Sequence, residues 1–420
     1  MPGSHQQLLR RFVTRLAPPL AAVAFSLAAA PGIAAWPEFR GPSGQGIAGD
    51  AAVALHWSES ENIAWKTALP GRGWSTPVIN GGLLWMTAAA DNGRSLQVLA
   101  VDPKNGELKL NVEVFQIENP PPVHEKNGYA SPTPILEGDR VYVHFGTLGA
   151  AALNTSGEIL WKNQELRFEH AHGPGGSAAS TKDLLIVSCD GTDRQFVAAL
   201  EKATGRVRWR TSRKDAAMAF STPLTIEAGG VEQIVSPGAN RAVSYEASTG
   251  RELWSIRYEG FSNVPRPVFA NGLVYVTSGF YNPVVYAVRP DGRGDVTRTH
   301  VAWEYRRGVP LTPSPIVVGG EFYMVSDRGI ATCLDAKTGE LLWQQRVGGE
   351  HSASPIRAAG RIYFLSESGE ARVIAPGRVY KELAKNRIDG RTLASLAVDG
   401  STIYLRSATH LYRIDESKAK

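Results

Sequence analysis

The nine residues Asp335-Ala-Lys-Thr-Gly-Glu-Leu-Leu-Trp343 contain the pattern that decides the fold, because a glycine followed by a tryptophan four residues later recurs along the chain. The copies end at Trp161, Trp209, Trp254 and Trp343, and Trp303 fits the pattern after an insertion that follows Gly292. An acidic or amide residue followed by Thr-Gly is typical of a hairpin turn, since glycine adopts the positive φ that such a turn needs. Tryptophans at intervals of about 40 to 49 residues indicate a repeat fold.

Each repeat also contains short runs of β-branched and aromatic residues, which predict strands. Examples are the segments 141–145, 184–188, 273–277 and 322–326. One small sheet cannot bury both of its faces, but sheets stacked around an axis can, and the tryptophan gives each sheet a large apolar side chain to pack against its neighbour. The sequence therefore predicts an all-β propeller.

Eight repeat starts can be counted, near residues 75, 131, 176, 221, 265, 314, 354 and 393. The eighth copy ends near Ile414, one strand short, while the segment 62–68 supplies a spare strand whose Trp65 lies two repeats before Trp161. We therefore predict an eight-bladed β-propeller of four-stranded antiparallel blades over residues 62–414, with the ring closed by this N-terminal strand. The alternative is a ring of seven blades with the eighth copy folded outside it.

The first 35 residues have the pattern of a signal peptide: arginines, an apolar stretch and a small-residue end at Ala34-Ala35. General secretion fits better than a twin-arginine route. We do not expect a lipoprotein, because no cysteine lies near the cleavage site. The alternative is a permanent N-terminal anchor. We expect a periplasmic or secreted protein without a transmembrane segment after cleavage. The predicted organisation is a signal peptide (1–35), an N-terminal extension (36–61), the propeller (62–414) and a C-terminal tail (415–420).

Composition excludes several classes of protein. Two cysteines in 420 residues cannot form a disulfide scaffold or a cysteine-rich zinc protein. The formal net charge of +5 falls to about +2 when Arg10, Arg11 and Arg15 leave with the signal peptide. We therefore expect no nucleic-acid partner, despite the basic isoelectric point. We expect a monomer.

The repeated motif, Ala/Leu-x-Asp/Glu-x-x-Thr-Gly-x-x-x-Trp in eight copies behind a signal peptide, resembles the PQQ-like (quinoprotein-type) propeller repeats over roughly residues 55–414. That superfamily includes PQQ-dependent alcohol dehydrogenases and the propeller lipoprotein of the outer-membrane assembly machine. The segment Trp36-Pro-Glu-Phe-Arg-Gly-Pro-Ser-Gly44 looks like the start of an exported bacterial branch of these proteins. The resemblance implies the fold much more strongly than it implies an activity.

Loop lengths indicate which face of the propeller binds a ligand. The Thr-Gly turns are short and uniform, whereas the opposite face carries the longer segments 87–95, 116–129, 165–175, 189–195 and 279–283. Binding residues gather on such loops, and aromatic, amide and arginine side chains suit a sugar, a planar ligand or a peptide segment. The candidate ligand-binding residues on this face are Trp74, His124, Asn127, Tyr129, His170, His172, Asp190, Arg194, Phe220, Asn263, Arg266, Tyr281 and His351.

Two groups among these candidates invite other chemistry. On a strand, the imidazoles of His170 and His172 would point the same way and could bind a metal with His124 or His351 as the third ligand, although a hydrogen-bonded loop pair is the simpler interpretation. Asp190, with its neighbour Asp193, could bind a cation or act as acid and base, but Asp-Gly is itself a turn signal.

The enzymes of the resembling superfamily use PQQ with a calcium site of acidic and amide ligands, a catalytic Asp and, in many members, a vicinal cysteine pair. This chain has no Cys-Cys pair, and no acidic cluster stands at its blade starts. We therefore expect no cofactor and no catalytic residue, and a non-catalytic binding or scaffold module for a protein or carbohydrate on the long-loop face. A PQQ- and calcium-dependent oxidoreductase of alcohols or sugars is the alternative, and a metal-dependent hydrolase at His170 and His172 is a third possibility.

Overall fold

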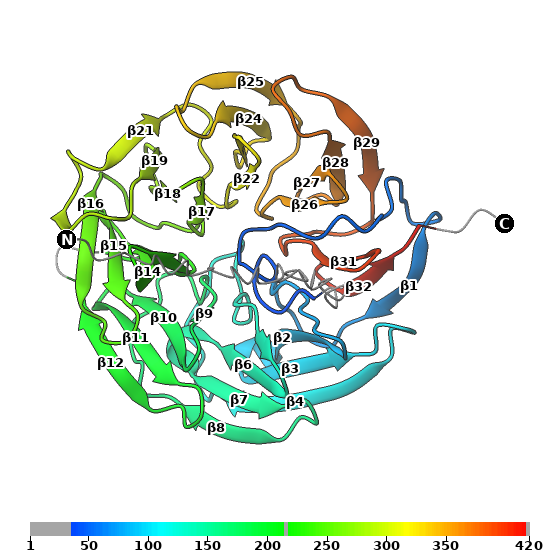
Figure 1. Cartoon of the computed structure of the whole chain (residues 1–420). Helices are drawn as coiled ribbons and strands as arrows, with labels where there is room; N and C mark the ends of the chain where they lie inside the picture. The colour runs from blue at the N-terminus through cyan, green and yellow to red at the C-terminus, as the bar shows by residue number, and fades with distance from the viewer. Residues whose placement is uncertain (1–34, 214–216, 417–420) are drawn as a thin grey trace, which may run out of the picture. The chain divides into compact units, whose positions relative to one another are not determined.

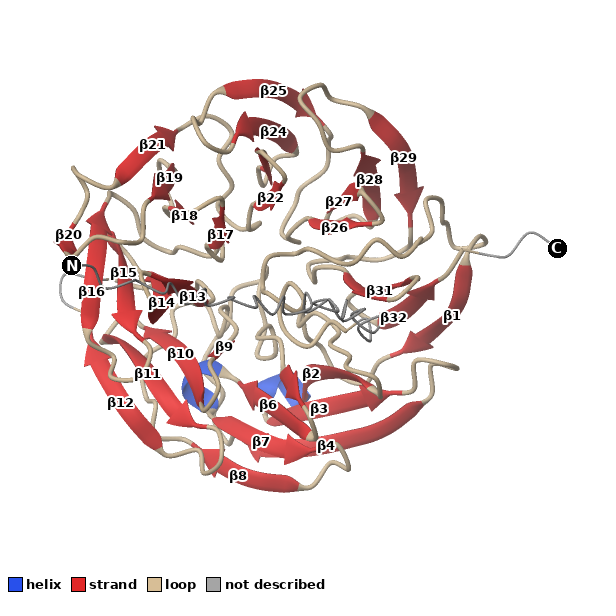
Figure 2. Ribbon diagram, viewed as in Figure 1, coloured by secondary structure: helices blue, strands red, loops and turns tan. Residues whose placement is uncertain are grey.

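A computed structural model describes residues 35–213 and 217–416 as eight β-sheets arranged around a central axis. Figure 1 shows the sheets following one another around the ring in chain order, and Figure 2 shows that strands and loops make up almost all of it. The predicted all-β, eight-bladed propeller of mainly four-stranded antiparallel blades is therefore confirmed. The predicted signal peptide lies almost entirely outside the described residues.

Each of the first four blades follows the chain from the axis outward. Blade 1 consists of β2 (Leu84–Ala90), β3 (Ser95–Val101) and β4 (Leu108–Gln116), with the 3-10 turn η1 (Asp91–Gly93). Blade 2 consists of β5 (Ile135–Glu137), β6 (Arg140–His144), η2 (Gly146–Leu148), β7 (Ala150–Asn154) and β8 (Ile159–Asn163). Blade 3 consists of β9 (Ala179–Ser180), β10 (Leu184–Asp190), β11 (Gln195–Glu201) and β12 (Val207–Ser212). Blade 4 consists of β13 (Leu224–Ala228), β14 (Val231–Pro237), β15 (Arg241–Glu246) and β16 (Glu252–Arg257).

The second half of the ring repeats the arrangement. Blade 5 consists of β17 (Val268–Ala270), β18 (Leu273–Thr277), β19 (Val285–Val288) and β21 (Val301–Tyr305). Blade 6 consists of β22 (Ile316–Val318), β23 (Glu321–Val325), β24 (Ile330–Asp335) and β25 (Leu341–Arg346). Blade 7 consists of β26 (Ile356–Ala358), β27 (Arg361–Leu365), β28 (Glu370–Ile374) and β29 (Glu382–Arg387). Blade 8 consists of β30 (Ala397–Asp399), β31 (Thr402–Arg406), β32 (His410–Ile414) and β1 (Ile63–Ala68).

The ring is closed by the N-terminal strand, as predicted. Strand β1 pairs antiparallel with β32, with Ile63 opposite Ile414 and Thr67 opposite Leu411. Pairing the first strand with the last gives blade 8 its fourth strand and protects the exposed backbone of β32. The alternative of seven blades with a separate eighth copy is therefore wrong.

The repeated tryptophans join each blade to the next. The indole N–H groups of five of them donate to backbone carbonyl oxygens in the hairpin turn of the following blade, over 2.8–3.1 Å. These pairs are Trp65 with Pro103, Trp161 with Lys202, Trp209 with Ala247, Trp303 with Ala336 and Trp343 with Gly377. The turn glycine is needed because a Cβ at Gly205 or Gly250 would overlap the ring of Trp161 or Trp209.

Blade 4 departs from this scheme. The insertion noticed after Gly292 forms β20 (Gly294–Asp295), which adds a fifth, parallel strand to the outer edge of blade 4 beside β16. Trp254 is covered by this addition and is fully buried, and its indole N–H donates to Gln233 Oε1 of its own blade over 2.9 Å. Blade 4 thus keeps the Gly-to-Trp motif in its sequence, but the indole of Trp254 contacts its own blade and not the next one.

The first part of the N-terminal extension crosses the centre of the ring. Its residues 36–48, which we call the plug, start beside blade 1, where Trp36 forms a bridge with Ile79, and end beside blade 7, where Ile47 forms a bridge with Arg357. Figure 1 shows this segment crossing the centre of the ring. The described residues contain no helix of the length and apolarity that a bilayer crossing requires.

Two buried arginines hold the plug. Arg40 of the plug is fully buried and donates to Ser314 O (3.3 Å) and Pro315 O (2.6 Å) of blade 6. Arg266 of blade 5 donates to Phe39 O (2.6 Å) and pairs with Glu38 (3.1 Å). Burial and the nearby Arg266 lower the pKa of Arg40 to about 9. The plug is therefore fixed by charge-assisted hydrogen bonds to several blades.

Candidate functional site

A cavity of about 560 Å³ lies at the mouth of the channel, among the loops that join consecutive blades. This volume is in the usual range for small-ligand sites. Its apolar wall is formed by Trp74, Met218, Phe220, Phe261, Val264, Phe280, Leu311 and Leu393, together with Phe39 of the plug. Its polar side chains include His124, Lys126, Asn127, His172, Ser262, Thr312 and Asp327. The lining comes from most of the blades, so only the closed ring assembles it.

The cavity is also lined by a belt of hydroxyl groups that the blade starts supply. The belt positions, one in each blade, are Thr76, Thr133, Ser177, Thr222, Arg266, Ser314, Ser354 and Ser395. In six consecutive pairs, the backbone N–H of one position donates to the hydroxyl oxygen of the next over 2.8–3.0 Å. Arg266 interrupts the belt because its side chain turns to the plug. The Ser/Thr-Pro starts of the repeat thus bond neighbouring blades at the axis.

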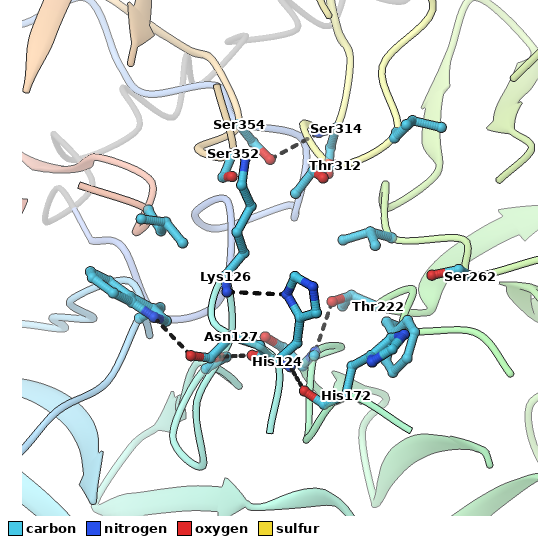
Figure 3. Close-up of a pocket in the computed structure, with 18 of the residues that line it drawn as sticks. His124, Lys126, Asn127, His172, Thr222, Ser262, Thr312, Ser314, Ser352 and Ser354 are labelled. Carbon is cyan, nitrogen blue, oxygen red and sulfur yellow. Dashed lines mark hydrogen bonds between the residues drawn. The ribbon is translucent and has the colours of Figure 1, made fainter. Parts of the chain in front are cut away.

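The structure brings five of the predicted binding residues to the cavity: Trp74, His124, Asn127, His172 and Phe220. The rings of His124 and His172 meet edge to face with centroids 5.2 Å apart, and His172 lies 5.8 Å from Phe220. Asn127 fixes this group, because its Nδ2 donates to His172 O (2.8 Å) while its own carbonyl oxygen accepts from Trp74 Nε1 (3.3 Å). Figure 3 shows the imidazoles side by side below Thr312 and Ser314.

The loop that carries His124 and Asn127 reaches across to blade 7. Lys126 Nζ pairs with Glu350 (3.0 Å) and Glu367 (3.2 Å), and Arg391 also pairs with Glu367 (3.3 Å). Hydrogen bonds and charges from Ser352, Lys126 and Arg391 outweigh partial burial and lower the pKa of Glu367. Lys126, the one lysine among the described lining residues, is therefore already paired with carboxylates in the absence of a ligand.

A second, much smaller cavity of about 20 Å³ contains His170 and Asp190. His170 Nε2 accepts from Thr147 N–H and His144 Nδ1 accepts from Gly146 N–H, both over 3.2 Å, so the neutral rings carry their protons on the other nitrogens. Those two nitrogens are buried without a hydrogen-bond partner among the described residues, while Asp190 Oδ1 lies 3.2 Å from Arg213 Nε in a fully buried ion pair. The volume and the mixture of donors and acceptors suit one buried water molecule.

Three predicted binding residues instead form hydrogen bonds or ion pairs within the protein. The Tyr129 hydroxyl donates to Pro121 O over 2.8 Å, and Arg194 is exposed and pairs with the adjacent Asp193. Asn263 is fully buried and donates to Tyr258 and to Thr277 O. None of the three is among the residues that line either cavity.

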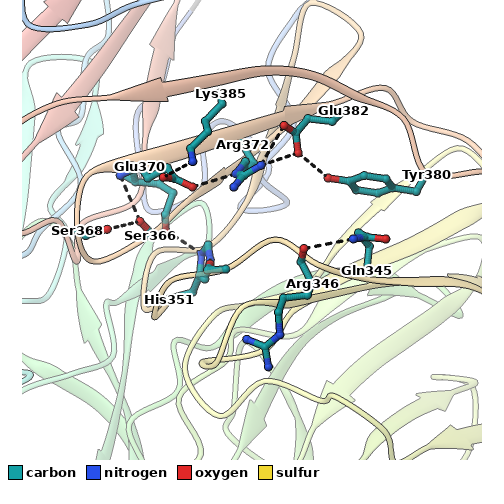
Figure 4. A network of polar contacts seen from close by, with 12 residues as sticks. Gln345, Arg346, His351, Ser366, Ser368, Glu370, Arg372, Tyr380, Glu382 and Lys385 are labelled. Carbon is teal, nitrogen blue, oxygen red and sulfur yellow. Dashed lines mark hydrogen bonds and ion pairs between the residues drawn. The ribbon is translucent and has the colours of Figure 1, made fainter.

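His351 is also placed away from the cavities, although its neighbour Ser352 lines the large one. Its ring is buried and lies within hydrogen-bonding distance of Leu365 O (3.1 Å) and Gly348 O (2.9 Å). Figure 4 shows this ring beside Ser366 and below the ion pairs of blade 7. Burial lowers the pKa of His351, so it is a neutral residue that joins two loops.

The two histidines of the His-Ala-His motif are separated into different cavities. They lie outside any strand, so the alternation of side chains that would align them does not apply. Within the described ranges 35–213 and 217–416, no group of three or more His, Cys, Asp and Glu side chains is placed to hold a metal ion.

Sequence reasoning missed several lining residues, among them Met218, Phe261, Ser262, Thr312 and Asp327. These residues lie in blade connections or tight turns without a distinctive motif. The belt positions could be found in the sequence, because repeated Ser/Thr-Pro motifs mark the starts of the blades. No sequence feature indicated the plug, apart from its position before the first strand.

The small cavity predicts acid sensitivity. Burial lowers the pKa of both His144 and His170 to about 4, so between about pH 6.5 and 4 the unfolded chain binds two protons that the folded chain does not. Burial raises the pKa of Asp190 to about 6, which opposes them by one proton below that pH. These three groups together take up a net one proton on unfolding, so their contribution should lower the free energy of unfolding by about 1.4 kcal/mol per pH unit from pH 6 to 4.

Urea unfolding at intervals from pH 7 to 4 measures this slope. The variant His170→Gln should lose one of the two histidine contributions and show a flatter dependence than wild type, whereas the exposed His56→Gln should not. Equal slopes for wild type and His170→Gln would contradict the assignment.

Together, the closed ring of eight blades and the tryptophans that join them define a propeller of the PQQ-like repeat class. The chain belongs to the family PQQ_2, described as Outer membrane protein assembly factor BamB, whose model matches residues 47–172, 150–231 and 193–420. The resemblance predicted from the repeats is therefore confirmed.

Individual relatives are distant. The tetrathionate hydrolase of Acidithiobacillus ferrooxidans is 22% identical over 318 residues, which cover 70% of this chain and 57% of that protein. The chain thus spans little more than half the length of this curated relative. The crystal structure of BamB from Moraxella catarrhalis has a TM-score of 0.61 at 13% identity, covering 84% of this chain and 99% of that one. A europium-containing methanol dehydrogenase has a TM-score of 0.44 at 11% identity, covering 82% and 90%.

Proposed function

We propose that this protein is an exported, non-catalytic binding module that takes part of a carbohydrate or protein ligand into the channel-mouth cavity. The observation that carries the proposal is the cavity itself, which combines aromatic rings with a few polar groups that point inward from different blades. Its scaffold is rigid, because belt, plug and tryptophans tie the blades together. Binding sites of this kind commonly sit on loops held by such a scaffold.

The chemistry of the lining supports binding over catalysis. An activated nucleophile needs a base within hydrogen-bonding reach. Among residues 35–213 and 217–416, no serine, threonine or cysteine of the cavity hydrogen-bonds to an imidazole. Asp327 is the only carboxylate among the described lining residues, so these residues provide no pair of carboxylates for acid and base.

The residues of the cavity do not fit PQQ and calcium, the alternative that the fold family raises. PQQ carries several carboxylates, yet the described lining includes no arginine and its single lysine is already paired with two glutamates. Calcium takes six to eight oxygen ligands, usually including several carboxylates. Addition of PQQ and calcium, followed by assay of dye-linked alcohol and sugar oxidation, should give neither saturable binding nor turnover.

Blocking the cavity tests the proposed function. Thr312 is a half-buried lining residue on a blade connection, and Thr312→Trp should fill the space without disturbing a strand. We expect ligands selected by wild type from a glycan array or a displayed peptide library to bind Thr312→Trp at least tenfold more weakly, by about 1.4 kcal/mol. Ser401→Trp, on the exposed turn between β30 and β31, is the matched control and should bind like wild type. Ligands from both collections that bind both variants equally would refute the cavity as the site.

A further inference from the structure

The rim of the cavity continues into three aromatic rings, Phe261, Phe280 and Tyr281, which we call the platform. Their centroids are 4.7–5.9 Å apart. Phe261 and Phe280 line the cavity, whereas Tyr281 extends beyond it. Phe280 is 45% and Tyr281 75% exposed, which is unusual for large rings on the surface of a folded protein. The platform is therefore an aromatic surface that leads out of the cavity.

The backbone holds this surface in place at some cost. Phe280 N–H donates to Phe261 O over 2.7 Å, and a Cβ on Gly279 would collide with the same oxygen, so only glycine fits there. Tyr281 has a φ of +85°, in the region that favours glycine. Strain of this kind at an exposed aromatic residue is a sign of function, because burial does not explain it.

Polar groups with unused hydrogen-bonding capacity face the cavity from different blade connections. His124 Nδ1 accepts from Lys126 N–H (3.2 Å), which leaves Nε2–H as a donor. Asp327 accepts from Leu311 N–H (2.6 Å) through one oxygen, which leaves the other as an acceptor. The hydroxyls of Ser262 and Thr312 can do both. Figure 3 shows Ser262, Thr312 and His124 around the same space.

The charges favour a ligand without a net charge. A ligand anion would meet Asp327, and the only cation of the described lining, Lys126, is already paired with two glutamates. A ligand cation would have a single carboxylate to pair with in the described lining, whose other polar side chains are mostly hydroxyl, amide and imidazole groups. The ligand therefore needs uncharged groups that both donate and accept hydrogen bonds, together with apolar faces that stack on aromatic rings. The hydroxyl groups and ring faces of a sugar meet both requirements.

We propose that the ligand is a neutral oligosaccharide, one end of which enters the cavity while the following units stack on the platform. The proposal rests on the proposed function and names its ligand class. It implies that affinity increases with chain length, because a disaccharide would occupy the cavity alone. Peptides and charged glycans are the outcomes that would exclude it.

An array of neutral di- to hexasaccharides, anionic glycans and random octapeptides tests the ligand class, with titration calorimetry on the best neutral series. Asp327→Asn keeps the acceptor for Leu311 N–H and removes the charge, and it should weaken binding about tenfold or more. Asp139→Asn, an equal change on the exposed turn between β5 and β6, should leave binding unchanged. Tyr281→Gly removes the ring and suits the positive φ, and it should weaken binding of the hexasaccharide at least fivefold but not that of the disaccharide.

The outcomes separate this inference from the proposed function. Preference for peptides or anionic glycans, with binding lost in Thr312→Trp, would keep the cavity as a binding site and overturn the neutral sugar. Equal loss of disaccharide and hexasaccharide in Tyr281→Gly, with native circular dichroism, would overturn the platform. Failure of every glycan and peptide to depend on Thr312 would remove the proposed function as well.

Discussion

Replacing Arg266 by leucine is expected to lower the free energy of unfolding by about 3–5 kcal/mol, the usual cost of removing one partner of a buried ion pair. Arg266 is 2% exposed and donates to Phe39 O, pairs with Glu38 and donates to Pro223 O over 3.1 Å. Without it, Glu38 is left as a mostly buried carboxylate that has lost this partner, and burial already raises its pKa. Urea unfolding at pH 7 measures the loss.

A second change separates the ion pair from general packing damage. In the Arg266→Leu background, Glu38→Gln removes the stranded charge, so the double variant should be more stable than Arg266→Leu alone. Independent effects that simply add would contradict a direct interaction. Arg251→Leu, whose side chain is 66% exposed in an ion pair with Glu246, is the surface control and should cost less than about 1 kcal/mol.

Replacing Gly250 by alanine should destabilise the ring by about 3–4 kcal/mol. Two effects add there: a φ of +71°, and a Cβ that would lie 2.5 Å from the ring of Trp209. Gly272→Ala isolates the first effect, because its φ is +75° and no atom lies within 4 Å of the new Cβ. It should cost only about 1–2 kcal/mol.

Urea unfolding of the two variants gives the comparison. The difference between them measures how much one tryptophan contact between blades contributes, with backbone strain held constant. Equal losses for Gly250→Ala and Gly272→Ala would mean that the indole moves away without cost, and that the repeated tryptophans are not what joins the blades.

The fold could be predicted because the signals that carry it are local and repeated. Five of the repeated Trp residues make the same contact with the hairpin turn of the next blade, so several weak signals along the sequence support one another. The closing strand was predictable too, since Trp65 continues the spacing. Blade 4 could not be, because the contact of Trp254 depends on where the insertion after Gly292 folds back.

The candidate site was predictable only in its face and in part of its membership. Trp74 and Phe220 directly precede blade starts that the repeat marks, so the repeat predicts that both lie near the axis. Asp327 and Thr312 lie on short connections whose role depends on eight blades meeting at one axis. Arg266 stands at a blade start, but its side chain turns to a segment more than two hundred residues earlier, which no local pattern indicates.

The plug also constrains the order in which the molecule is assembled. Residues 36–48 are synthesised before any blade, yet their partners on blades 5, 6 and 7 belong to the second half of the chain. Strand β32, which receives β1, is made at the very end. The blades therefore have to assemble around the N-terminal plug. The ring closes only when β1 pairs with β32, through contacts some 350 residues apart in sequence, and such long-range contacts are characteristic of slow folding. An internal core that is synthesised first can serve as the template on which later blades are gathered.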